Sequence, residues 1–149
     1  KDDWVIKGCP VNGPSVAALD EIVAVAWYTG VNLKPEVKVI FSKDEGENFG
    51  QPVVVDDGRP IGRVDVIILP DGTALVSWLE IAGRSTEIRV RRVYPNGMKD
   101  ASFTLEKAGG GSASGWPQME INNDEIIFAW TDAESPSTIR SAAVKLINF

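Results

Sequence analysis

One short apolar sequence centred on tryptophan occurs three times in this chain, as Val25-Ala26-Trp27-Tyr28, Val76-Ser77-Trp78-Leu79 and Phe128-Ala129-Trp130-Thr131. The tryptophans recur at a spacing of about 51 residues. About 15 residues before each tryptophan lies a glycine-led start, and ten or eleven residues after it lies a cation in a strand-like run. The starts are Gly13-Pro14, Gly62-Arg63 and Gly115-Trp116-Pro117, and the cations are Lys38, Arg89 and Arg140. Three landmarks in three copies define an internal repeat.

The second copy shows most plainly what each repeat contains. Runs with strand character cover residues 62–69, 73–80, 87–93 and 101–105. Turn residues separate them, namely Pro70-Asp71-Gly72, Gly83 and Tyr94-Pro95-Asn96-Gly97. No window has the 3.6-residue period of a helix. The tryptophan strands are almost continuously apolar, as expected where both faces of a sheet are buried, and blades stacked around a ring create that environment. The repeat therefore predicts a four-stranded antiparallel propeller blade.

The number of strands predicts how the blades are completed. The repeats over residues 13–57 and 62–107 have four strands each, and the repeat over residues 115–148 has three. A further strand, residues 3–7, precedes the first repeat and would complete a blade. The predicted fold is all-β, with three four-stranded antiparallel blades that form half of a six-bladed β-propeller.

Three blades do not close a ring, because propellers need about four to eight. A monomer would also expose an apolar blade face at each end, which favours association. Two interpretations remain: the chain is half of a longer six-bladed protein, or two copies form a symmetric six-bladed ring. In the second, the strand of residues 3–7 from one copy completes the third blade of the other. The expected partner is therefore a second copy, in a homodimer.

The composition argues against several classes of function. A net charge of −6 at pH 7 argues against a nucleic-acid partner, which needs a basic surface. No apolar run approaches the ~20 residues that span a bilayer. With no histidine and the single cysteine Cys9, we expect no metal site and no cofactor. The sequence starts at Lys1 without a signal-peptide pattern, which suggests upstream sequence that is missing or cleaved, and a soluble, exported protein is one interpretation.

Residues 42–49 form a motif of the pattern Ser-x-Asp-x-Gly-x-x-aromatic, with Ser42, Asp44, Gly46 and Phe49 at the defined positions. The side-chain oxygens of Ser42 and Asp44 can accept backbone N–H groups, Gly46 permits a positive φ, and we expect Phe49 to pack beneath the turn. The motif resembles the Asp-box, or BNR repeat, of sialidase-type propellers. In those families it is a structural device away from the catalytic centre, which implies a hairpin lock here.

The resemblance to sialidase-like BNR-repeat proteins covers essentially the whole chain. Residues 8–14, 62–65 and 76–80 look like parts of the later half of such proteins, which implies a six-bladed propeller. Fold does not determine activity. Sialidase catalysis needs three arginines, a Tyr/Glu nucleophile couple and a carboxylic acid. The Arg-Ile-Pro motif of active sialidases is absent, and the tyrosines, Tyr28 and Tyr94, follow a core tryptophan and begin a turn. The enzyme interpretation stays open and is not favoured.

A candidate site lies where the inner strands begin and the tryptophan strands end. Arg63 and Asp65 are two residues apart, so we expect them to share a strand face. Glu80 and Asp132 each follow a repeat tryptophan by two residues, and Asn12 precedes an inner strand. If these ends face the central funnel, the five residues converge on one polar, ligand-binding pocket. The alternative is that their charges form salt bridges between blades.

These features lead to three hypotheses about function. The favoured one is a non-catalytic, sialidase-like propeller module that binds a glycan or another polar ligand at the funnel of an assembled ring. The alternatives are an exo-sialidase-type glycoside hydrolase and a purely structural assembly unit. Residues 109–115 are interpreted as a flexible connector, and Cys9 as a small buried residue.

Overall fold

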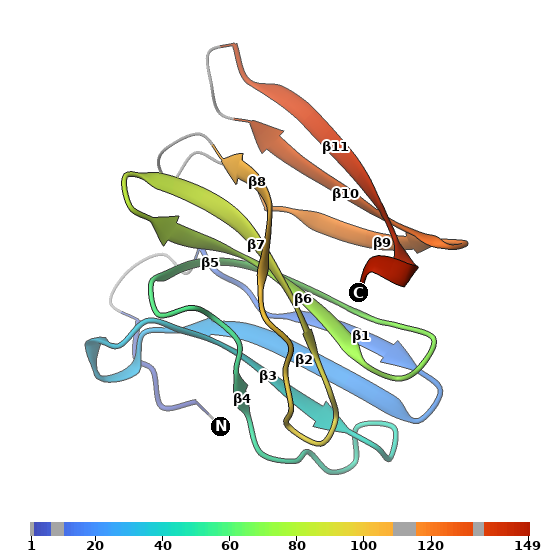
Figure 1. Ribbon diagram of the computed structural model, residues 1–149. Coiled ribbons are helices and arrows are strands. Elements are labelled where there is room, and N and C mark those ends of the chain that lie inside the picture. Colours follow the sequence, from blue (N-terminus) through green and yellow to red (C-terminus); the bar gives the residue numbers. More distant parts are fainter. Residues whose placement is uncertain (1, 7–10, 109–115, 133–135) are drawn as a thin grey trace.

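The computed structural model describes residues 2–6, 11–108, 116–132 and 136–149, and it has three antiparallel sheets stacked on one another (Figure 1). The first sheet, at the bottom of Figure 1, contains β1 (Ser15–Leu19), β2 (Ile22–Thr29), β3 (Glu36–Ser42) and β4 (Val53–Val54). The second contains β5 (Pro60–Ile68), β6 (Ala74–Ala82), β7 (Ser85–Val93) and β8 (Phe103–Ala108). The third, at the top, contains β9 (Gln118–Asn122), β10 (Glu125–Asp132) and β11 (Thr138–Lys145). The two short 3-10 turns are η1 (Val31–Leu33) and η2 (Leu146–Asn148).

The predicted all-β fold is confirmed. Within each sheet, strands that follow one another in the sequence pair antiparallel, which is the meander of a propeller blade. We call the three sheets blade one, blade two and blade three. The third has three strands among the described residues, as its shorter repeat predicts. The predicted connector 109–115 and Cys9 lie outside the residues that the structure describes.

The turn between β5 and β6 shows how local chemistry produces a blade. The carboxylate of Asp71 accepts hydrogen bonds from the backbone N–H of Thr73 at 3.1 Å and from its hydroxyl at 2.7 Å. Gly72 has a φ of +80°, and a Cβ on it would lie 2.7 Å from the Cδ1 atom of Ile22 in blade one. Glycine is therefore required both by the turn and by the close approach of a neighbouring blade.

The strand register confirms the alignment of the three repeats. Each repeat tryptophan lies directly opposite the repeat cation on the next strand, in the pairs Trp27–Lys38, Trp78–Arg89 and Trp130–Arg140. Residues two apart on a strand share a face, so the residues two positions beyond each tryptophan lie on the tryptophan's face. We call this side of each blade its tryptophan face.

Two apolar layers hold the three blades together. The layer between blades one and two contains Ala26, Val37 and Val39 from blade one and Trp78 from the tryptophan face of blade two. The layer between blades two and three contains Leu79, Ile88 and Val90 from blade two and Phe128 and Trp130 from blade three. Burying each of these aliphatic side chains contributes roughly 1.5–3 kcal/mol. In both layers the tryptophan face of one blade packs on the opposite face of the blade before it.

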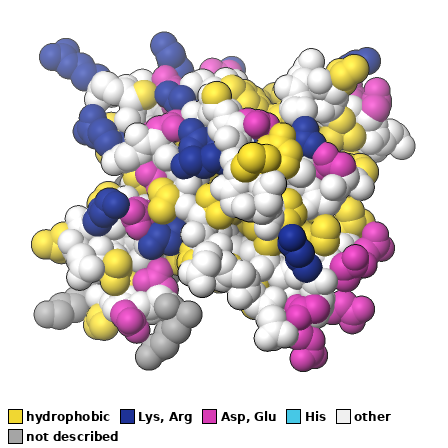
Figure 2. Space-filling view, turned by 60° about the horizontal axis from the view of Figure 1, so that its bottom comes forward, with side chains coloured by type: hydrophobic (Ala, Val, Ile, Leu, Met, Phe, Trp, Pro, Cys, Tyr) yellow, Lys and Arg dark blue, Asp and Glu magenta, His cyan; other side chains and the backbone are white. Residues whose placement is uncertain are grey.

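The tryptophan face of blade one has no such neighbour among the described residues. A cavity of about 940 Å³ lies there, lined by Val25, Trp27 and Ile40 together with Asp2, Asp3, Trp4 and Ile6. Figure 2, which brings the bottom of Figure 1 forward, shows hydrophobic side chains at the surface among acidic and basic ones.

The segment 2–6 forms no strand, although a strand was predicted over residues 3–7. Trp4 packs edge-on against Tyr28 with ring centroids 5.6 Å apart, and its indole would lie 3.1 Å from a Cβ on Gly30. The indole Nε1 of Trp27 donates to Asp2 at 2.7 Å. The segment is therefore held by side chains against the end of blade one, and its pairing with a blade of another copy stays a prediction.

The Ser42–Phe49 motif forms a side-chain lock at the hairpin between β3 and β4. The hydroxyl of Ser42 donates to Asp44 at 2.6 Å and accepts the N–H of Gly46 at 2.9 Å, and Asp44 also accepts the N–H of Asn48 at 2.8 Å. Hydrogen bonds from Ser42 and Asn48 lower the pKa of Asp44. Gly46 has the expected positive φ of 92°. Phe49 forms an isolated bridge with Ser42 at the base of the turn, and its side chain is 44% exposed and lines the cavity on the tryptophan face of blade one.

Candidate functional site

The innermost strands of the three blades are joined by one carboxylate. Asp65, on β5, is buried and accepts the hydroxyl of Ser15 on β1 at 2.8 Å and the backbone N–H of Met119 on β9 at 2.7 Å. The hydroxyl of Ser15 accepts in turn the N–H of Val66 at 3.3 Å. Asp65 therefore connects all three blades through hydrogen bonds between β1, β5 and β9.

The start of β5 is irregular because two consecutive residues have positive φ. Gly62 has a φ of 99° and Arg63 a φ of 59°, and the pairing of β5 with β6 shifts register on both sides of Gly62. Asn12 supports this bulge: its side-chain oxygen accepts the N–H of Arg63 at 3.0 Å, and its amide nitrogen donates to the carbonyl of Ile61 at 3.1 Å. A Cβ on Gly62 would lie 2.6 Å from the Asn12 side chain. A left-handed arginine costs on the order of 1 kcal/mol, and such strain concentrates at functional sites.

The side chain of Arg63 lies against a tryptophan that precedes blade three. Its guanidinium carbon is 4.0 Å from the ring centroid of Trp116, and one terminal nitrogen donates to the carbonyl of Val11 at 3.3 Å. Arg63 is buried, whereas Trp116 is 42% exposed. The amide of Asn12, which directly precedes the first repeat, thus lies together with a guanidinium from the second repeat and an indole from the third. We call Asn12, Arg63 and Trp116 the strand-start cluster.

Trp116 was missed as a site residue by the sequence analysis. The sequence contains a signal, because Gly115-Trp116-Pro117 is one of the three repeat starts, which include Gly62-Arg63. A tryptophan at the same repeat position as a candidate site arginine is the pattern that indicates it.

A separate groove of about 410 Å³ runs along the inner strands. Asp65 lines this groove together with Ser15, and the exposed side chains of Gln118 and Glu120 line it from β9. The groove marks the side of the molecule where the inner strands of the blades lie together, which in a closed propeller faces the central channel.

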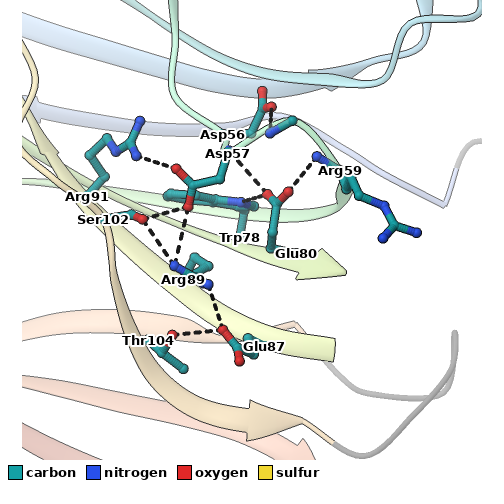
Figure 3. A network of polar contacts seen from close by, with 11 residues as sticks. Asp56, Asp57, Arg59, Trp78, Glu80, Glu87, Arg89, Arg91, Ser102 and Thr104 are labelled. Atoms are coloured by element: carbon teal, nitrogen blue, oxygen red, sulfur yellow. Dashed lines mark hydrogen bonds and ion pairs between the residues drawn. The ribbon is translucent and has the colours of Figure 1, made fainter. Parts of the chain in front are cut away.

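Glu80 is buried and serves the connection between blades one and two rather than an open pocket (Figure 3). Its carboxylate accepts the indole N–H of Trp78 at 2.5 Å and the backbone N–H groups of Arg59 at 2.5 Å and Asp57 at 3.4 Å. Arg59 and Asp57 belong to the segment that leads from β4 to β5. Glu80 therefore fixes the inter-blade connector to the tryptophan of blade two.

Asp57 extends this network toward the outer strands of blade two (Figure 3). It forms ion pairs with Arg91 at 2.5 Å and Arg89 at 3.4 Å, and it accepts the hydroxyl of Ser102 at 2.6 Å. Arg89 also pairs with Glu87 at 2.8 Å. The repeat cation of blade two is thus part of a charged network that includes the segment between blades one and two.

Asp132 lies at the end of β10 and forms an ion pair with the repeat cation of its own blade, Arg140, at 3.2 Å. The predicted convergence of five residues on one pocket is therefore found only for Asn12 and Arg63, which contact each other. Asp65, Glu80 and Asp132 each have other hydrogen-bond partners in different parts of the blades. Ligand binding by these residues stays a prediction.

Within the described residues, no group of three or more histidine, cysteine, aspartate or glutamate side chains is placed to hold a metal ion. In the same part of the chain, no helix is long and apolar enough to cross a membrane.

No protein-family model matches the sequence, and no curated protein matches it either. Among solved structures, the chain is similar to Bacteroides ovatus Xyloglucan PUL GH43B, with a TM-score of 0.61 and 16% sequence identity over 89% of this chain and 26% of that chain. It is also similar to a thermostable family-43 glycoside hydrolase, with a TM-score of 0.61 and 13% identity over 89% of this chain and 50% of that chain. The chain thus spans half or less of each.

At these identities the likeness concerns the fold alone. It supports an all-β partial propeller with blades like those of glycoside hydrolases. Neither of the two neighbours is named as a sialidase. The class that the fold defines is a β-propeller module.

Proposed function

We propose that this chain is a non-catalytic, carbohydrate-binding β-propeller module whose ligand contacts the strand-start cluster of Asn12, Arg63 and Trp116. The observation that carries the proposal is the partly exposed indole of Trp116 beside the guanidinium of Arg63 at 4.0 Å. The cluster lies where the inner strands of the three blades begin, so a ligand there would contact every blade.

The chemistry of the cluster suits a sugar. A partly exposed indole offers a flat apolar surface for the C–H face of a pyranose ring, and polar groups beside it can bind hydroxyl or carboxylate oxygens. The backbone N–H of Arg63 is hydrogen-bonded to Asn12, and the residue has a left-handed φ of 59°. Because a fixed guanidinium loses little further conformational freedom when it binds, such an arrangement favours specific recognition.

The two structural neighbours support carbohydrate as the ligand class, because the name of one refers to xyloglucan and the other is named as a glycoside hydrolase. The lock formed by Ser42, Asp44 and Gly46 supports the sialidase-like form of the propeller. Xyloglucan oligosaccharides and sialosides are therefore the first two sets of probes.

Binding to a glycan array that contains both sets, followed by calorimetry on each positive glycan, tests the proposal. We expect Trp116→Leu to weaken binding by about tenfold or more, which corresponds to ~1.4 kcal/mol. Trp116 is partly exposed, so the variant keeps the fold. Met98→Leu, a change of an exposed apolar side chain in a turn of blade two outside the cluster, is the control and leaves the affinity unchanged. Equal affinity of Trp116→Leu and the unsubstituted chain would place the ligand elsewhere, and an array without any positive glycan would favour a structural unit.

A hydrolase is the second candidate, because both structural neighbours carry glycoside hydrolase names. The two best-buried carboxylates near the inner strands, Asp65 and Glu80, each accept backbone N–H groups that connect blades. This use of their lone pairs supports a binding module over a catalytic acid–base pair. Release of the chromophore from aryl xylosides or aryl sialosides, lost in Glu80→Gln or Asp65→Asn at unchanged fold, would establish the hydrolase instead.

A further inference from the structure

We propose that a second copy of this chain covers the open tryptophan face of blade one, so that two copies close a six-bladed ring. The inference is independent of any ligand. It rests on a comparison of equivalent positions in the three repeats. The interface between neighbouring blades occurs twice within the chain, and these two interfaces serve as a template for the interface between two copies.

The template is the packing of each tryptophan face on the blade before it. Trp78 is fully buried against Ala26 and Val37 of blade one, and Trp130 is 5% exposed against Ile88 of blade two. Both interfaces join the same two surfaces: a tryptophan face on one side, and on the other the opposite, apolar face of the blade before it, which we call the receiving face. A repeat protein buries its core only through such neighbours.

At one end of the stack, no blade among the described residues covers the tryptophan face. Trp27 is only half-buried at the position where Trp78 and Trp130 are buried. Beside it, Val25, Ile40 and the exposed Phe49 line the cavity of about 940 Å³. Apolar side chains around a cavity at a blade end indicate a surface that another blade covers.

At the other end, the receiving face of blade three remains open. Strand register makes Ile139 equivalent to Val37 and Ile88, because these residues lie opposite Thr131, Tyr28 and Leu79. Val37 and Ile88 are 0% and 1% exposed, whereas Ile139 is 76% exposed. Ile139 therefore holds an interface position whose partner surface is missing within the described chain.

The outer edge of blade three also differs from the outer edges of the other two blades. The third strands of blades one and two, β3 and β7, pair with the fourth strands β4 and β8. β11 is the third strand of its blade and has no fourth strand among the described residues. An exposed strand edge readily accepts an added strand. Residues 2–6 lie at the end of blade one, where the receiving face of a second copy would dock, and are placed to supply that strand.

A surface and its complement at opposite ends of one chain form a head-to-tail contact, which yields a closed ring if the rotation closes. Three blades in each of two copies give six, within the range in which propellers close. The inner strands of one copy form only part of the wall of a central channel, so the funnel is complete only in the pair.

Light scattering coupled to size-exclusion chromatography, in reducing buffer and over a range of concentrations, tests the proposal on the full chain. We expect a mass near twice 16.1 kDa. Ile139→Lys places a charge in the interface from an exposed position, and we expect it to raise the dissociation constant by about 100-fold or more. Met98→Lys, at a 60% exposed turn position of blade two, is the matched control and leaves the dimer intact.

A mixture of two variants separates loss of contact from loss of fold. Val25→Lys blocks the open tryptophan face and Ile139→Lys blocks the receiving face, so each is expected to be monomeric by itself. A pair made of one of each retains one native interface, and the dimer is expected to return in the mixture. A monomer at every concentration of the unsubstituted chain, a series of higher masses, or a dimer unaffected by Ile139→Lys would each overturn the proposal, as would a mixture that stays monomeric.

Discussion

The tryptophan faces of blade one and blade two have the same sequence pattern, but they differ in how far the tryptophan is buried and in which residue accepts its indole N–H. In blade two, Trp78 is fully buried and donates its indole N–H to Glu80, which stands two residues further along the same strand. In blade one, Thr29 occupies that position, and the indole of Trp27 donates instead to Asp2. The hydroxyl of Thr29 donates to the same carboxylate at 3.1 Å. A carboxylate therefore meets the indole in both blades, but in one of them it comes from outside the sheet.

The comparison shows that in both blades the carboxylate links the indole to the segment that leads into the blade. Glu80 holds the connector between blades one and two through the backbone N–H groups of Asp57 and Arg59. In blade one the carboxylate, Asp2, belongs to the segment that leads into the blade, and the donors, Trp27 and Thr29, belong to the sheet. The acceptor of the indole N–H is therefore a buried residue of the sheet in blade two and a residue of an exposed segment in blade one.

The largest expected effect is the loss of the carboxylate in blade two. Glu80→Ala leaves the buried indole N–H of Trp78 and the part-buried backbone N–H groups of Asp57 and Arg59 without their acceptor, and we expect the free energy of unfolding to fall by about 3 kcal/mol. Thr29→Ala, at the equivalent position of blade one, is expected to cost about 1 kcal/mol, because Asp2 still accepts the indole N–H. Urea unfolding at one fixed protein concentration measures both. Glu80→Gln, which keeps the shape and one acceptor oxygen, should lie between them; a Thr29→Ala cost as large as that of Glu80→Ala contradicts the comparison.

This contrast also marks what a sequence can predict about the fold. Trp27, Trp78 and Trp130 with their opposite cations define the repeat, because strand alternation and turns such as Pro70-Asp71-Gly72 are local properties of the chain. The positions of strands in blade two follow from them. The hydrogen-bond partner of each indole does not follow from the repeat, because the contact of Asp2 with Trp27 depends on how the segment 2–6 packs on blade one, which is a tertiary contact.

The candidate site was predictable only in part, for a related reason. Arg63 and Asp65 are two residues apart and would share a face of a regular strand, but the positive φ of Gly62 and Arg63 and the register shift break that rule. Arg63 contacts Trp116, whereas Asp65 contacts Ser15 and the N–H of Met119. Irregular backbone at a glycine-led start is visible in the sequence as a possibility, and the partners it selects depend on how the blades stack.

A smaller effect is expected from the tryptophans themselves. Trp78→Phe removes a buried indole N–H from Glu80 and vacates volume in the apolar layer, which is expected to cost about 2 kcal/mol. Trp27→Phe acts on a half-buried residue and is expected to cost under about 1 kcal/mol. Unfolding in the Ile139→Lys background, where the proposed dimer is blocked, measures the difference for the isolated chain. If the two costs were equal in that background, the tryptophan face of blade one would already be sealed within one copy, against the contrast drawn between the blades.

The smallest expected effect is the pH dependence that Asp2 contributes at blade one. Burial raises the pKa of Asp2, but the hydrogen bonds from Trp27, Thr29 and the N–H of Trp4 outweigh it and hold the pKa below the usual value of 3.8. A carboxyl whose pKa is lower in the folded state stabilises the fold above its unfolded pKa, and this stabilisation is lost as the pH falls through the folded pKa. We therefore expect the urea midpoint of the unsubstituted chain to be higher than that of Asp2→Asn at pH 7. Below pH 3.8 we expect the two midpoints to converge. Asp20→Asn, which changes an exposed carboxyl at a turn, is the control for general charge effects. A gap that persists or widens in acid would mean that Asp2 does not hold the segment through its charged form, and that Trp4 alone attaches it to blade one.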